Sequence, residues 1–295
     1  MKVLVTGASG LLGRATVRNF KAAGHTVVGT AYSRVTGDLV QLDLLNSTQV
    51  NSLLKEVNPQ VIVHCAAERR PDVAEKDHEG TLKLNAQVPG HLATWAKEHD
   101  ATLIYISTDY VFDGTSPPYQ VDAQPAPLNF YGESKLAGEQ AIRDTYPQAI
   151  ILRVPILYGD VEFNGESAVN LLVDVVKDHN KPAVMDNYCL RYPTNVDDVG
   201  RVIKDLAVNK ENGKAIEGTY HFTAEEMLTK LDMCRIFADL LKVPIDHLEA
   251  QNTISESASA SRPKDCHLST SRLQSAGIDV SFVPFQSWFQ TRFAQ

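Results

Sequence analysis

The chain has 295 residues, 43% of them hydrophobic, and a formal net charge of -8 at pH 7. A chain of this length and apolar content can bury a large core, which excludes a disordered or fibrous protein. The negative charge, with no stripe of Lys and Arg, argues against a nucleic-acid partner, because a phosphate backbone would be repelled.

The first half of the chain alternates short β-branched apolar runs with longer amphipathic segments. This pattern predicts buried parallel strands joined by crossover helices. The expected strands are Val3–Val5, Thr26–Gly29, Val61–Cys65, Thr102–Ser107 and Ile150–Val154, and the expected helices are Leu12–Ala23, Ser47–Val57, Leu82–Glu98 and Tyr131–Asp144. Because such a rhythm requires helices on both faces of the sheet, the predicted fold is a doubly wound parallel α/β (Rossmann) sheet.

Beyond about residue 155 the rhythm changes to the helical segments Ala168–His179 and Thr229–Leu241, separated by proline-marked turns. We therefore expect a dinucleotide-binding domain over residues 1–155, to which the chain returns around residues 186–222. Residues 156–185 and 223–295 are expected to form a smaller α/β lobe on the substrate side. Within that lobe, the Ser-rich stretch Ser255–Ser261 is predicted to be a mobile loop.

A glycine-rich turn follows the first predicted strand and opens the first predicted helix, which is the context typical of a dinucleotide site. Gly7 permits the tight turn, Gly10 lets the backbone approach a pyrophosphate, and Gly13 lets the helix pack closely on the strand. The pyrophosphate would then lie on the positive N-terminus of the helix.

The end of the second predicted strand indicates which dinucleotide is bound. A site for NAD(H) usually has an acid there, whereas this chain reads Gly29-Thr30-Ala31-Tyr32-Ser33-Arg34. Arg34 can pair with a 2′-phosphate, which favours NADP(H), unless it is a solvated surface arginine. Farther along, Asp43 and Leu44 either flank the adenine ring or Asp43 simply ends a strand.

A candidate reaction centre follows the fourth long strand. Tyr131 and Lys135 are four residues apart on a predicted helix, so both side chains share one face, where the ammonium would lower the pKa of the phenol. Tyr131 would then act as general acid or base, while Thr108, at the end of a strand, would hold a substrate carbonyl.

Several other polar residues are candidates for the site or for the core, and for Arg69 and Arg70 two interpretations are open. Arg69 or Arg70 could meet a phosphate at the carboxyl edge of the sheet, or both could belong to a surface ion-pair network. Arg262 could reach a substrate phosphate, and His64 is expected to be a core histidine. No His, Cys or carboxylate cluster has the spacing of a metal site, so no metal is predicted.

The cysteines and the chain start bear on the compartment. Cys65, Cys189, Cys234 and Cys266 form no C-x-x-C pair, which indicates neither a zinc knuckle nor a disulfide framework and favours a reducing environment. Only two residues precede the first apolar run, and no apolar stretch has membrane-spanning length. We therefore expect a cytoplasmic protein without membrane contact.

Several motifs together resemble the extended short-chain dehydrogenase/reductase family. They are T-G-A-S-G-L-L-G, H-C-A-A-E-R-R-P-D-V, I-S-T-D-Y-V-F-D-G, P-A-P-L-N-F-Y-G-E-S-K-L and L-R-V-P-I-L-Y-G. The similarity runs from Lys2 to about Gly277 and includes Arg191-Tyr192-Pro193-Thr194. It lies in the branch that contains bacterial dTDP-4-dehydrorhamnose reductase, and within that branch it looks most like the regulatory beta subunit of methionine adenosyltransferase.

This resemblance implies a set of site residues. The NADP site would be lined by Ser9, Gly10, Leu11, Leu12, Tyr32, Ser33, Arg34, Asp43, Leu44, Cys65, Arg69, Tyr131, Lys135 and Leu157. Thr108, Tyr131 and Lys135 would occupy the positions of the reductase triad, with Asp109 beside them. Because the beta subunit keeps such residues too, an intact triad does not establish turnover.

The resemblance leaves two functions open. The first is an NADP-loaded regulatory subunit of methionine adenosyltransferase, favoured because Pro155-Ile156-Leu157 stands where the sugar reductases carry a tryptophan. The second is an NADPH-dependent reductase of a nucleotide-linked 4-keto-6-deoxysugar. This chain also starts at the first strand and has a shorter tail than the beta subunit, which weakens the expectation of partner binding that the resemblance implies. The tail aromatics Trp288, Phe289 and Phe293 either anchor on the catalytic subunit or pack back onto the small lobe.

Overall fold

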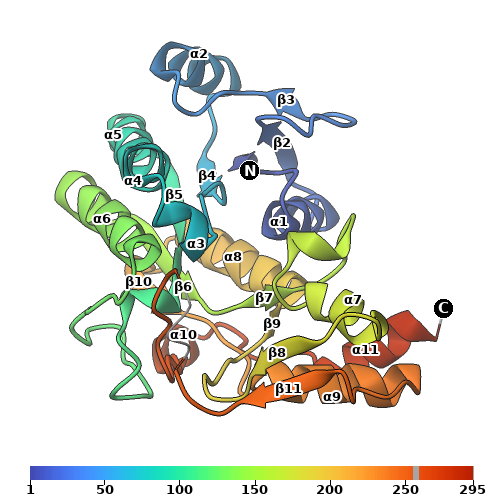
Figure 1. Cartoon of the computed structure of the whole chain (residues 1–295). Helices are drawn as coiled ribbons and strands as arrows, with labels where there is room; N and C mark the ends of the chain where they lie inside the picture. Colours follow the sequence, from blue (N-terminus) through green and yellow to red (C-terminus); the bar gives the residue numbers. More distant parts are fainter. Residues whose placement is uncertain (255–258, 295) are drawn as a thin grey trace.

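The computed structural model describes residues 1–254 and 259–294. Its centre is a seven-stranded parallel sheet with the order β10-β6-β5-β4-β1-β2-β3 (Figure 1). The strands are β1 (Lys2–Thr6), β2 (Thr26–Ala31), β3 (Val40–Gln41), β4 (Val61–His64), β5 (Thr102–Thr108), β6 (Ile150–Val154) and β10 (Gly218–His221). The central strands β4, β5 and β6 are buried along their whole length, as expected for parallel strands covered on both faces. The predicted doubly wound fold is confirmed.

Helices cover both faces of this sheet. On one face lie α1 (Leu11–Ala22) and α8 (Val196–Glu211), whose Val199, Val202 and Ile203 share a core with the β1 valines. On the other face lie α2 (Ser47–Val57), α5 (Val88–Glu98) and α6 (Phe130–Thr145), and α5 continues the short helix α4 (His78–Leu82) through the π-helical turn η1 (Lys83–Gln87). Short connecting helices are α3 (Pro71–Ala74), η2 (Asp109–Val111), η3 (Asn164–Glu166) and α10 (Ser271–Ser275).

A second hydrophobic core lies beside the sheet, in the lower part of Figure 1. It is formed mainly by α7 (Leu171–Lys177), α9 (Lys230–Leu241) and α11 (Phe285–Phe293), with the parallel pair β8 (Ala183–Asp186) and β11 (Leu248–Gln251). A further pair, β7 (Leu157–Tyr158) and β9 (Thr194–Asn195), stands between this core and the sheet. The lobe therefore has its own apolar centre.

The predicted elements of the first half are present, with small shifts at their ends. The strand predicted to end at Cys65 ends at His64, and the helix predicted from Leu82 is preceded by α4, which begins at His78. Neither α8 nor β10 was expected from the sequence pattern, although both belong to the main sheet and its covering layer. Of the predicted mobile loop, residues 255–258 lie outside the described residues.

The aromatic residues near the chain end pack inward. Phe289 is 2% exposed, and its ring centroid lies 4.6 Å from that of Phe237 on α9. Trp288 and Phe293 are partly buried against the same core, with the Trp288 ring 5.3 Å from that of Tyr158. Of the two alternatives for these side chains, the structure shows the second, a terminal helix that packs back onto the lobe.

Candidate functional site

A cavity of about 930 Å³ lies at the carboxyl ends of the central strands. The residues that follow β1, β4, β5 and β6 line it, and the lobe closes its other side. In doubly wound folds ligands collect at this edge, where the strand order reverses. Every residue predicted above for the cofactor or the reaction lies on the wall of this one cavity. Their roles stay predictions.

The glycine turn after β1 has the geometry that a dinucleotide needs. Gly7 adopts a φ of 66°, and a Cβ on Gly13 would lie 2.1 Å from the Gly7 carbonyl oxygen, so neither position accepts a side chain without rearrangement. Gly10 is the N-cap of α1 and offers no side chain to cap the helix. The first backbone N–H groups of α1, at the cavity wall, are therefore available to a phosphate, so the residues fit the predicted cofactor.

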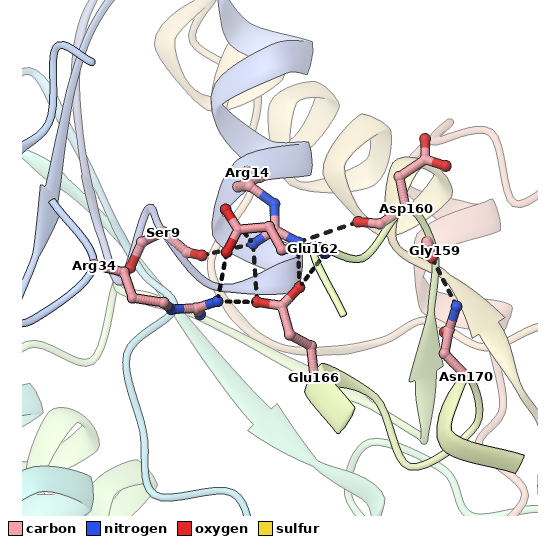
Figure 2. A network of polar contacts seen from close by, with 8 residues as sticks. All are labelled: Ser9, Arg14, Arg34, Gly159, Asp160, Glu162, Glu166 and Asn170. Carbon is pink, nitrogen blue, oxygen red and sulfur yellow. Dashed lines mark hydrogen bonds and ion pairs between the residues drawn. The ribbon is translucent and has the colours of Figure 1, made fainter. Parts of the chain in front are cut away.

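Arg34 belongs to a network of ion pairs beside the glycine turn (Figure 2). Its guanidinium donates to Glu166 and, at 2.8 Å, to Glu162. Arg14 donates to the same Glu166 carboxylate at 2.6 Å and to the Ser9 carbonyl at 2.7 Å. A 2′-phosphate that binds Arg34 must therefore share the guanidinium with two carboxylates or displace them.

The charge state of Glu166 follows from these contacts. Burial alone would raise its pKa, but hydrogen bonds from Arg14 and Arg34 outweigh burial and lower the pKa to about 2. The side chain is 3% exposed, so Glu166 is a buried carboxylate between two arginines. It ties the segment after β7 to the phosphate-binding turn.

The candidate reaction centre is assembled by local caps. Asn129 caps α6 by accepting the Gly132 N–H at 2.9 Å, which fixes the helix that carries Tyr131 and Lys135. Thr108, the last residue of β5, donates to Asp109 at 3.0 Å. The Thr108, Tyr131 and Lys135 side chains thus come to one cavity from a strand end and a helix start.

Burial dominates the protonation of this centre. It raises the pKa of Tyr131, although the Thr108 hydroxyl opposes the shift, and it lowers the pKa of Lys135 to about 7. It also raises the pKa of Asp109 to about 7. The expected lowering of the Tyr131 pKa is therefore not found, because burial outweighs it. The Lys135 Nζ lies 4.0 Å from the centroid of the Tyr105 ring. The Tyr131 phenol is therefore protonated at neutral pH.

The structure separates the remaining alternatives. Arg69 and Arg70 both line the cavity, and Arg70 also pairs with Glu68 at 2.7 Å. Arg262 lines it too but pairs with Asp72 at 2.8 Å. His64 is a core residue whose Nδ1 lies 2.7 Å from the Thr6 hydroxyl, and burial lowers its pKa to about 3.

Tyr32 and Asp43 lie at the outer end of the cavity and also border a neighbouring hollow of about 630 Å³. Tyr32 is 69% exposed, which leaves its ring free to cover a bound base. Within residues 1–254 and 259–294, no group of three His, Cys, Asp or Glu side chains could hold a metal ion. None of the helices in that part of the chain combines the length and apolar character that crossing a bilayer requires.

Several charged residues of this site, from α1 and from the chain beyond residue 155, were not predicted from the sequence. Arg14, Glu162 and Glu166 form the network around Arg34, and Arg191 and Lys230 line the cavity. No local pattern marks them, since Arg14 and Glu166 are 152 residues apart. For Arg191 the one available signal was its place in a motif that supported the family resemblance.

Comparisons with known proteins agree with this geometry. The family model of the RmlD substrate binding domain matches residues 1–290. Methionine adenosyltransferase 2 subunit beta from Mus musculus is 44% identical over 286 residues, which cover 97% of this chain and 85% of that protein. Two solved dTDP-4-dehydrorhamnose reductases share the fold, each with a TM-score of 0.85 and each covering 99% of this chain and 98% of its own.

These two enzymes come from Clostridium acetobutylicum, at 28% identity, and from Bacillus anthracis, at 26% identity. The Bacillus anthracis enzyme was solved in complex with NADP, which is the cofactor predicted here. The predicted relationship to both the beta subunit and the reductases is confirmed. This chain belongs to the RmlD substrate-binding-domain family of extended short-chain dehydrogenases/reductases.

Proposed function

We propose that this chain is an NADP(H)-binding regulatory subunit that assembles with a methionine adenosyltransferase catalytic subunit. The observation that carries the proposal is the similarity to the mouse beta subunit, which spans both the sheet and the lobe. A second observation supports it. The segment Pro155-Ile156-Leu157 lines the cavity at the place where the resemblance puts a tryptophan in sugar reductases.

The cofactor would lie along the sheet side of the cavity. The turn Gly7–Gly13 and the start of α1 would hold the pyrophosphate, and Arg34 the 2′-phosphate. Tyr131 and Lys135 would line the same cofactor site. The part of the chain that holds NADP(H) would be residues 1–155 with the returning segment 186–222, and residues 156–185 and 223–295 would form the lobe.

We also propose a cytoplasmic location. The four cysteines are free thiols, and three of them are buried. Burial raises the pKa of Cys65 and of Cys234 to about 12, so both stay protonated and unreactive. Such thiols suit a reducing compartment.

Size-exclusion chromatography tests the regulatory function. The full chain is mixed with the methionine adenosyltransferase catalytic subunit of the same organism in the presence of NADPH. We expect one peak that contains both proteins, and two peaks for a matched mixture in which the Bacillus anthracis reductase replaces this chain. Separate elution of this chain would contradict the proposal and move the assignment to the second candidate.

The second candidate is an NADPH-dependent reductase of a nucleotide-linked 4-keto-6-deoxysugar. It is favoured by the meeting of Thr108, Tyr131 and Lys135 in the cavity and by the neutral state of the Tyr131 phenol. NADPH, when bound, supplies a hydride. The Thr108 hydroxyl would orient the substrate carbonyl, and the Tyr131 hydroxyl would give its proton to that oxygen.

The variant Tyr131→Phe tests this candidate, because it removes the proton donor and keeps the ring. It should abolish oxidation of NADPH by a 4-keto sugar nucleotide and leave the dissociation constant of NADPH nearly unchanged. Full turnover in the variant would remove Tyr131 from the mechanism. The absence of turnover in the unmodified chain would leave the regulatory function as the assignment.

A further inference from the structure

Three cations from the chain beyond residue 155 line the cavity wall and are not used by the proposed cofactor site. They are Arg191, Lys230 and Arg262. Arg262 is balanced by its ion pair with Asp72. Arg191 has only a longer ion pair, 3.8 Å to Asp186, and Lys230 has no ion pair within the described residues. Each is held in place by well-formed local structure.

Arg191 is a buried cation with one side unsatisfied. It is 4% exposed, and its Nη1 donates to the carbonyls of Leu190 at 2.9 Å and Pro263 at 3.3 Å. Its Nη2 has no hydrogen-bond partner in the described residues, and the Asp186 carboxylate lies 3.8 Å away. Burying a guanidinium without completing its hydrogen bonds is costly, so a hydrogen-bond acceptor beside Nη2 would stabilise Arg191.

Lys230 is the first residue of α9. The cap of that helix is rigid, because Thr229 and Asp232 exchange hydrogen bonds in a capping box. A cation at this position is disfavoured by the positive end of the helix dipole. Burial and the charges of Arg191 and Arg262 lower the pKa of Lys230, and in the described residues its ammonium makes no hydrogen bond or ion pair.

The nearby acids do not offset these two cations. Burial raises the pKa of Asp109 to about 7, so that carboxyl is only partly ionised at neutral pH, and Asp72 is engaged by Arg262. Within the described residues, Asp186 is the remaining carboxylate that acts on both Arg191 and Lys230, and it lies 3.8 Å from Arg191. One further negative charge would therefore be stabilised between these cations.

This position adjoins the candidate reaction centre. The Arg191 guanidinium carbon lies 6.0 Å from the centroid of the Tyr110 ring, and that ring is 6.0 Å from the ring of Tyr131. The positive charge of Arg191 acts to lower the pKa of Asp109, against the larger effect of burial. The Tyr110 ring thus lies beside both Arg191 and Tyr131, the proposed proton donor, so a group bound by Arg191 would lie close to Tyr131.

We propose that Arg191 and Lys230 bind one oxyanion, a carboxylate or a phosphate, of a small ligand that occupies the cavity beside Asp109 and Tyr131. The ligand is small at this end because Arg191 is buried and only a compact group reaches it. The site goes beyond the proposed function. It requires neither turnover nor a catalytic subunit, and it uses none of the residues assigned to NADP(H).

Anion-dependent thermal stability tests the site. The full chain is saturated with NADPH and titrated with inorganic phosphate, and separately with malonate, at constant ionic strength. Binding to the folded state raises the melting temperature in a saturable way. We expect at least one of the two anions to do so, and Lys230→Met and Arg191→Met to weaken that binding by about tenfold or more.

The matched control is Arg235→Met, which removes one cation from the exposed side of the same helix. It should bind the anion as the unmodified chain does. If Arg191→Met does not fold, Lys230→Met decides the question alone. Saturation by phosphate only identifies a phosphorylated ligand, and saturation by malonate only identifies a carboxylate.

Two outcomes would overturn the proposal. One is no saturable effect of either anion, and the other is equal binding in Lys230→Met and the unmodified chain, which would mean an adventitious ion only. The dissociation constant of NADPH, measured in the same variants, should stay within about twofold of the original. Failure of the anion site is thereby distinguished from failure of the cofactor site.

Discussion

The two walls of the cavity are built in different ways. On the sheet wall, Gly7 directly follows β1 and Thr108 ends β5, so local sequence decides where they lie. On the lobe wall, Glu166, Lys230 and Arg262 come from segments that tertiary packing brings to the cavity. The sheet wall is common to dinucleotide folds, whereas the lobe wall carries the features that distinguish one ligand from another.

The largest effect is expected from a substitution that disrupts the sheet wall and so weakens NADPH binding. Gly13→Ala would place a methyl group 2.1 Å from the Gly7 carbonyl oxygen and would force the phosphate-binding turn to move. A clash of this kind costs about 1–3 kcal/mol, so the dissociation constant of NADPH should rise by up to about a hundredfold. Titration of NADPH fluorescence measures it.

Gly90→Ala is the matched control, since its new methyl group on α5 would meet only the Ala141 methyl at 3.3 Å. It should leave NADPH affinity unchanged. Normal NADPH binding by Gly13→Ala would show that the turn is not the pyrophosphate site.

The contrast between the walls also explains what the sequence could reveal. The strand β1, the glycine turn and the spacing of Tyr131 and Lys135 are local patterns, and these parts of the fold and site were predictable. The ion pairs of Glu166 and the isolation of Arg191 depend on distant segments that meet only after folding. The direction of the Tyr131 pKa shift was mispredicted for the same reason, because burial is a tertiary property.

The second prediction tests the connection between the walls at Glu166. Glu166→Gln leaves Arg14 and Arg34 without the carboxylate that they share. We expect a loss of about 2 kcal/mol in the free energy of unfolding, less than for a fully buried pair because both guanidinium groups reach solvent. Urea denaturation measures this loss.

The same variant should bind NADPH more tightly, since Arg34 no longer shares its charge with Glu166. Glu162→Gln is the control, because Glu162 is 47% exposed and its pair should contribute less than about 1 kcal/mol. Equal stability of Glu166→Gln and the unmodified chain would mean that the network does not connect the lobe to the turn.

The third prediction tests whether Arg34 binds the cofactor or only forms ion pairs with Glu162 and Glu166. Arg34→Ala should weaken NADPH by about tenfold and NADH by less than about twofold, because only NADPH has the 2′-phosphate. Arg235→Ala, which removes an exposed guanidinium paired with Asp232 outside the cavity, should change neither. Equal losses for both cofactors would assign Arg34 to the ion-pair network alone.

The smallest expected effect concerns Asp109, where the two walls meet. Its pKa is raised from 3.8 to about 7, so between about pH 4 and pH 7 the folded chain binds more protons than the unfolded chain. Stability contributed by this group is therefore present at low pH and is lost as pH rises through the folded pKa. Asp109→Asn does not titrate and escapes this loss.

The variant should consequently gain stability relative to the unmodified chain as pH rises from about 4 to about 7, with a constant difference above that range. A gain of about 1 kcal/mol is expected, because relaxation around the carboxylate reduces the cost of ionising it. Urea denaturation across this pH range gives the difference. A difference independent of pH would show that Asp109 is ionised throughout, and that the charge of Arg191 is already matched before any oxyanion binds.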